Sequence, residues 1–141
     1  MSSQEVPANQ YQHHMKIDWM DFVTSDNITP ATEANLVERA VIVGRIGIMM
    51  LACGTGSWRV RNSMNIAART LGMTCSADIG LVSIEYTCMD DHQSYTQALS
   101  LPSTGVNTSK LNAMEHFMKD MEAEGVSWTI GEIHNRLNEI K

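Results

Sequence analysis

The chain has 141 residues with 43% hydrophobic residues, which fits one compact domain and leaves no room for a second of ordinary size. Its formal net charge of -6 argues against a general nucleic-acid binder, because such a protein needs a basic face for phosphate. The three cysteines lack C-x-x-C spacing and no signal peptide is visible, so we expect a reduced, cytosolic chain without zinc or another cofactor.

Residues 1–28 are polar and irregular, and we interpret them as a flexible leader in front of a single domain, residues 29–141. We expect the aromatic pair Trp19 and Phe22 in this leader to dock onto the domain. Since Thr29 can cap a helix and the following proline suits the first helical position, the first helix is predicted from there to about residue 52. Its apolar stretch is shorter than the ~20 residues that cross a bilayer, which predicts a buried helix.

A glycine-rich turn then leads into an amphipathic helix. Gly54 and Gly56 are expected to take backbone conformations closed to other residues, and Thr55 or Ser57 to cap the first free amides. Arg59 lies in the first turn, where its charge opposes the helix dipole, so we expect it to have a partner. An apolar stripe recurs at the helical interval along this helix: Val60, Met64, Ala67, Ala68 and Leu71.

The middle of the chain changes to β composition. Three short segments, residues 74–80, 81–89 and 94–101, are rich in β-branched and aromatic residues. Residues 90–93, Asp-Asp-His-Gln, have the chemistry of a hairpin connection, and we interpret them as a solvated tip and not as a metal site. Because the links are short, the segments predict an antiparallel meander.

Two helices are predicted after the sheet. Asn107 or Thr108 can cap the first, which ends near Gly125, and the second begins at Thr129. The first has an apolar face formed by Leu111, Met114, Phe117, Met118 and Met121, and the second one formed by Ile130, Ile133, Leu137 and Ile140. The last stripe stops abruptly at Lys141, which we interpret as a chain cut from a longer protein.

The chemistry of the glycine-rich turn suggests a modest binding site. Thr55 and Ser57 offer hydroxyls, Arg59 a guanidinium, and Asn107 a second polar contact if the two helix starts converge. We expect these four residues to hold the carboxylate of a small amino acid, although an ordinary tight turn is the simpler reading of the glycines. No residue is assigned a catalytic role, and an alternative is a small hydrolase that uses Ser57 or Cys53 with a histidine such as His116.

Several of these features occur together in a known family. The order of these features is Gly54, Arg59-Val60, a helix that ends in Leu71-Gly72, a β meander, and Gly105-Val106-Asn107 followed by Lys110-Leu111. In this order they resemble the N-terminal soluble domain of the bacterial threonine/serine exporter family. The resemblance covers residues 38–121. The chain departs from the family where members commonly carry Gly-Ala-Glu-Thr, and where an arginine often precedes the Gly-Val-Asn.

The resemblance implies a cytoplasmic domain of an exporter of small hydroxy amino acids, not an enzyme, with a regulatory, gating or assembly role. Its implied partners are the membrane portion of the same transporter or a partner membrane subunit, with small amino acids as ligands, and a homo-oligomer is left open. The implied location is the cytoplasmic face of the cell membrane. A stand-alone sensor of a small ligand is a further alternative. The predicted fold class is α+β, with two N-terminal helices, a small antiparallel meander, and two C-terminal helices.

Overall fold

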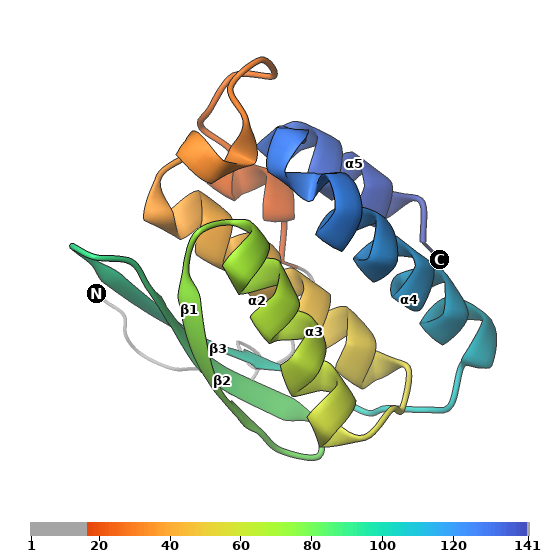
Figure 1. The fold of residues 1–141 in the computed structure, drawn as a ribbon. Helices are drawn as coiled ribbons and strands as arrows, with labels where there is room; N and C mark the ends of the chain where they lie inside the picture. The colour runs from red at the N-terminus through yellow and green to blue at the C-terminus, as the bar shows by residue number, and fades with distance from the viewer. Residues whose placement is uncertain (1–16, 141) are drawn as a thin grey trace.

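The computed structural model describes residues 17–140, and Figure 1 shows how they are arranged. In chain order the elements are η2 (Trp19–Phe22), η3 (Ala31–Glu33), α2 (Leu36–Ala52), α3 (Ser57–Thr70), β1 (Thr74–Ile79), β2 (Ser83–Met89), β3 (Ser94–Ser100), α4 (Thr108–Glu124), η4 (Gly125–Ser127) and α5 (Ile130–Asn138), where η marks a 3-10 helix. This order confirms the predicted α+β class. Residues 1–16 of the predicted leader lie outside the described residues.

The central helix, α2, begins later than the sequence predicts. Its N-cap is Asn35, whose side-chain oxygen accepts a hydrogen bond from the amide of Glu38 at 2.9 Å. The predicted start at Thr29 and Pro30 is wrong, because Pro30 forms an isolated β-bridge with Thr129 and a short 3-10 helix follows. Contact with a distant segment thus overrides a local helix-start signal. The predicted burial of the helix is confirmed, since nearly all of its residues are buried.

The sheet is an antiparallel meander in which β2 lies between β1 and β3, as predicted. Each strand lies within two residues of its predicted bounds. Burial alternates along the strands, so that one face carries the buried side chains of Ile84, Tyr86, Cys88 and Leu99 and the other is exposed. The buried face is therefore the one that receives the helices.

The domain has three layers. In Figure 1, α2 and α3 lie on one face of the sheet, α3 over β1 and α2 over β2 and β3, and α4 and α5 lie beyond them. The apolar faces of residues 41–51 and 111–121 predict that α2 and α4 together cover the sheet. This prediction is wrong for α4, because α3 occupies that place and α4 packs on α3. An apolar stripe shows that a helix buries one face, but it does not show which neighbour that face meets.

The two C-terminal helices begin at predicted caps. Asn107 accepts a hydrogen bond from the amide of Lys110 at 3.0 Å, and Thr129 forms a reciprocal capping box with Glu132. Both predicted stripes are confirmed: Met114, Phe117, Met118, Met121, Ile130, Ile133 and Leu137 are buried, and Leu111 and Ile140 are partly buried against the core. Within residues 17–140, no helix combines the length and apolar character needed to cross a bilayer.

Part of the predicted leader is attached to the domain. Trp19 packs against the core, with its ring centroid 5.8 Å from Cζ of Arg45, which confirms the expected docking of this residue. Phe22 is half-buried. The amides of Thr24 and Ser25 donate to the carboxylate of Glu38 at 2.7 and 2.9 Å. The chain just before the predicted domain boundary therefore forms specific contacts with α2.

Candidate functional site

The turn between α2 and α3 is held in place by the segment that precedes α4. Gly54 has φ of +80°, the left-handed region that other residues avoid, and a Cβ there would lie 3.0 Å from the carbonyl oxygen of Gly105. The amide of Asn107 donates to the carbonyl of Cys53 at 3.1 Å. The segment before α4 thus lies directly against the α2–α3 turn.

The start of α3 differs from its prediction. Gly56 is the N-cap, with ordinary extended backbone angles of φ -70° and ψ 155°, and no side chain caps the helix. The expected capping by Thr55 or Ser57 is wrong, because Ser57 is already the first helical residue and the cap position falls on a residue without a side chain. No side-chain acceptor among the described residues therefore caps the first amides of α3, and an open space lies beside the turn.

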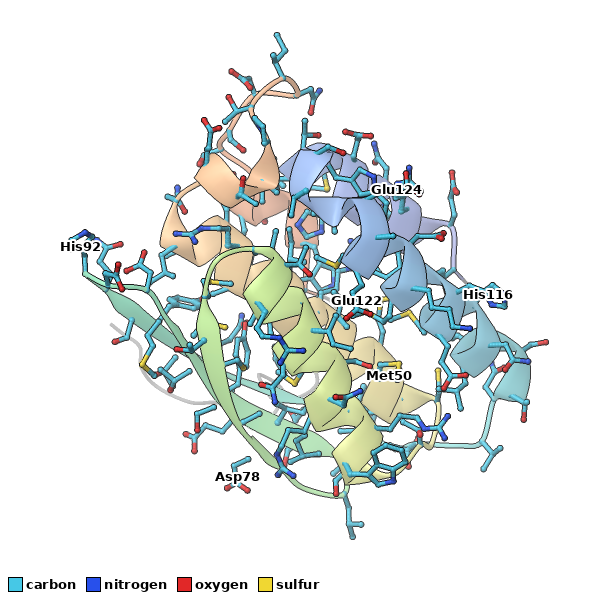
Figure 2. The ribbon with its side chains drawn as sticks, in the orientation of Figure 1. Met50, Asp78, His92, His116, Glu122 and Glu124 are labelled. Atoms are coloured by element: carbon cyan, nitrogen blue, oxygen red, sulfur yellow. The ribbon has the colours of Figure 1, made fainter. Side chains whose placement is uncertain are left out.

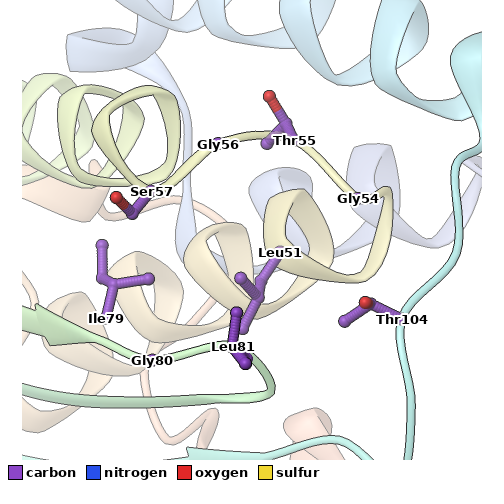
Figure 3. A pocket seen from close by; sticks show the side chains of 9 residues that line it. All are labelled: Leu51, Gly54, Thr55, Gly56, Ser57, Ile79, Gly80, Leu81 and Thr104. Atoms are coloured by element: carbon purple, nitrogen blue, oxygen red, sulfur yellow. The ribbon is translucent and has the colours of Figure 1, made fainter.

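That space is a cleft of about 430 Å³ between the α2–α3 turn, the β1–β2 turn and Thr104. Figure 3 shows its lining: Leu51, Gly54, Thr55, Gly56, Ser57, Ile79, Gly80, Leu81 and Thr104. Three residues bring hydroxyls and three bring apolar side chains, and in Figure 3 the hydroxyl of Thr55 points away from Leu81. Among residues 17–140, no charged side chain lines this cleft.

The other two predicted site residues point elsewhere. Arg59 pairs with Glu115 of α4, and its Cζ lies 5.3 Å from the ring centroid of Trp58. The expectation that this arginine needs a partner is confirmed. The side chain of Asn107 is occupied in capping α4. The structure thus brings Thr55 and Ser57 together at one cleft, but it does not bring the side chains of Arg59 and Asn107 to them.

Arg59 faces a second cavity, which the sequence did not reveal. This cavity of about 350 Å³ lies between α3 and α4 and is lined by Met50, Arg59, Asn62, Ser63, Ile66, Asn112, Glu115, His116, Met118 and Lys119. Figure 2 shows Met50 between the two helices and His116 on α4. The packing of α4 against the polar residues of α3 is a long-range contact without a local signal in the sequence.

The residues of the hydrolase alternative are not joined in the described part of the chain. Cys53 is buried and its thiol donates to the carbonyl of Met49 at 3.2 Å, while burial raises the pKa of that thiol. Ser57 is exposed at the first cleft, and Nδ1 of His116 bonds the carbonyl of Asn112 at 2.9 Å. No hydrogen bond among residues 17–140 links His116 to either nucleophile, so the geometry offers no activated serine or cysteine.

The hairpin tip has an ordinary structural role. One oxygen of Asp90 accepts the amides of His92 and Gln93, each at 2.8 Å, and the other pairs with Arg39 at 3.2 Å. Hydrogen bonds from these two amides are the main reason that the pKa of Asp90 is lowered. Within the described residues, no group of three or more His, Cys, Asp or Glu side chains is placed to hold a metal ion.

Comparison with known proteins gives one match. Residues 41–141, which include α3, the sheet, α4, α5 and most of α2, match the family described as "Putative threonine/serine exporter". No curated protein and no solved structure matches the chain. Since the match spans well over half of the 141 residues, the chain belongs to the threonine/serine exporter family.

Proposed function

We propose that this chain forms a cytoplasmic domain of a threonine/serine exporter, with a regulatory, gating or assembly role. The observation that carries the proposal is the family match over residues 41–141, which relates the chain to amino-acid transport. Its proposed location is the cytoplasmic face of the cell membrane. Its proposed partner is the membrane portion of the same transporter or a partner membrane subunit, and a homo-oligomer is left open.

The layered fold supports a role in transmitting a signal. The α2–α3 turn is bonded to the segment before α4 through the amide of Asn107 and the carbonyl of Cys53. The ion pair between Arg59 and Glu115 joins α3 to α4 a little farther along. The end of α2 and the start of α3 are therefore each in contact with α4 or the segment before it, and contacts of this kind can pass a displacement between helices, as a gating domain requires.

Efflux of threonine tests this proposal. Cells that carry the gene in its natural context are loaded with labelled threonine, and its release is compared between the wild type, Gly54→Ala and Gly105→Ala. Gly54 is held in the left-handed region against Gly105, whereas a Cβ at Gly105 would meet nothing within 4 Å. We expect slower efflux for Gly54→Ala alone, at an equal amount of exporter in the membrane fraction. Equal efflux in all three would contradict a gating or regulatory role.

Access of protease tests the proposed location. The domain is expected to resist protease added to intact cells and to be cleaved in inverted membrane vesicles. Cleavage in intact cells would place it on the opposite face. Loss of this chain from the membrane fraction when the membrane portion is deleted would support the proposed partner.

A further inference from the structure

The cavity between α3 and α4 contains a hydroxyl, that of Ser63, to which no other described residue is bonded. Ser63 is only 6% exposed and lines this cavity, and no hydrogen bond of its hydroxyl occurs among the described residues. A serine within a helix commonly bonds the carbonyl four residues earlier, and this bond is absent among the described residues. The Ser63 oxygen is not one of the fully buried atoms that lack a partner, so it is open to the cavity. The Ser63 hydroxyl is therefore available to a molecule that enters the cavity.

Opposite charges are placed at the same cavity. Arg59 and Glu115 line it and pair with each other, and their side chains are 39% and 38% exposed. A pair as exposed as this contributes little to stability, so a ligand can separate the two groups at small cost. Lys119 adds a positive charge to the lining, and Met50, Ile66 and Met118 supply apolar surface.

We infer that the α3–α4 cavity binds a small zwitterionic α-amino acid with a hydroxyl on its side chain. Arg59 receives the carboxylate, Glu115 the ammonium, and Ser63 the side-chain hydroxyl, while the methionines and Ile66 contact the aliphatic carbons. This inference rests on the proposed function and adds to it the place where the domain detects the exported compound.

The choice of this cavity over the cleft at the α2–α3 turn follows from charge. The turn cleft is lined by hydroxyls, glycines and apolar side chains, and the guanidinium that was expected there faces the other cavity. An amino acid carries two opposite charges about one carbon atom. Of these two cavities, the α3–α4 cavity is the one that offers a partner for each charge.

Amide chemical shifts of the 141-residue chain, titrated with amino acids, test the inference. We expect threonine and serine to shift the amides of Asn62, Ser63 and residues 112–116, with affinities on the order of millimolar because so small a ligand makes few contacts. Valine has the shape of threonine without its hydroxyl, and we expect at least tenfold weaker binding. Threoninamide lacks the carboxylate and N-acetylthreonine lacks the ammonium, so both are expected to bind at least tenfold more weakly than threonine.

Variants assign the three contacts. Arg59→Gln and Glu115→Gln are each expected to weaken threonine binding at least tenfold. Ser63→Ala is expected to weaken threonine binding and to leave valine binding unchanged, a pattern that a merely structural role would not produce. Arg69→Gln and Glu124→Gln remove exposed charges of the same two helices outside the cavity lining and serve as controls with unchanged binding. Circular dichroism confirms that each variant is folded.

Three results would overturn the inference. They are no response at tens of millimolar threonine, shifts centred on Thr55, Ser57 and Thr104, or equal binding of threonine and valine. The proposed function would survive any of them, because a domain that gates or assembles an exporter without binding its substrate still changes efflux. Conversely, threonine binding with normal efflux in Gly54→Ala would support the cavity and count against gating.

Discussion

Nη1 of Arg45 lies 2.9 Å from Nδ1 of His134, in a buried contact between α2 and α5. Since an arginine nitrogen can only donate, Nδ1 of His134 is the acceptor, and the ring is neutral with its proton on Nε2. Arg45 also donates to the side-chain oxygen of Asn138 at 2.5 Å, and its Nε has no hydrogen-bond partner within the described residues. The pair joins the central helix to the last one.

This contact predicts a loss of stability in mild acid. Burial and the charge of Arg45 lower the pKa of His134 to about 4, whereas an unfolded histidine has a pKa near 6.5. Between these values the unfolded state binds the additional proton, so the free energy of unfolding falls as the pH drops from about 6.5 to about 4. The expected loss is on the order of 2 to 3 kcal/mol, measured by urea unfolding at several pH values.

His134→Gln is the control for that prediction, because glutamine offers an acceptor to Arg45 and does not titrate. Its stability is expected to fall less steeply than that of the wild type between pH 6.5 and pH 4. If the free energy of unfolding falls equally with pH in the two proteins, groups other than His134 cause the loss of stability in acid.

Glu38 predicts a different change, in the segment before the domain. Burial would raise the pKa of this carboxyl, but hydrogen bonds from Thr24 and Ser25 outweigh burial and lower it. Its contribution to stability is therefore present above the ordinary pKa and is lost as the pH falls through the lowered value. Glu38→Ala is expected to cost about 1 to 3 kcal/mol at neutral pH and to expose residues 17–30 to protease. Glu33→Ala, at an exposed residue without a side-chain partner in the described chain, should show neither effect.

The predictable part of this fold is the part encoded by neighbouring residues. The helical spacing of apolar residues located α3, α4 and α5, and the change to β-branched and aromatic residues located the three strands. Both signals arise because each element buries one of its faces. The start of α2 was missed because Pro30 pairs with Thr129, a residue 99 positions farther along. The position of α4 was not predicted for a similar reason, because its apolar stripe could pack equally well against a sheet or against other helices.

The candidate site was less predictable than the fold. The sequence identified the turn and the need of Arg59 for a partner, but not Glu115, which lies 56 residues away. Likewise, no local pattern indicates that His134 is buried, since its partner Arg45 is 89 residues distant. Polar contacts between distant residues leave no periodic signal, so residue types alone could not show which groups meet.

The two glycines of the α2–α3 turn predict opposite responses to one substitution. The expectation that both need unusual conformations holds for Gly54, at φ +80°, and is wrong for Gly56, at φ -70°. Gly54→Ser is therefore expected to cost about 1 to 3 kcal/mol through backbone strain. Gly56→Ser places a hydroxyl at the N-cap of α3 and should gain a few tenths of a kcal/mol. Thermal unfolding of the two variants decides the matter, and equal destabilisation of both would contradict this account of the turn.

The three cysteines differ in a way that predicts their order of reaction. Cys75 and Cys88 are opposite each other on β1 and β2, with Cys75 half-buried and Cys88 fully buried. The interaction between the two neighbouring thiols lowers the pKa of Cys75 and, together with burial, raises that of Cys88. Burial raises the pKa of Cys53 as well. Cys75 therefore has both the better access and the larger thiolate fraction.

Alkylation of the folded chain with iodoacetamide at neutral pH, followed by peptide mass spectrometry, should modify Cys75 at least tenfold faster than Cys53 or Cys88. In denaturant all three are expected to react at similar rates, because burial and the thiol pair are lost together. Cys88→Ala removes the neighbouring thiol that lowers the pKa of Cys75, so the pH midpoint for the reaction of Cys75 should move upward even if the smaller side chain improves access. A midpoint that stays in place would show that exposure alone selects Cys75, and equal labelling of Cys53 would contradict the burial of that thiol at the end of α2.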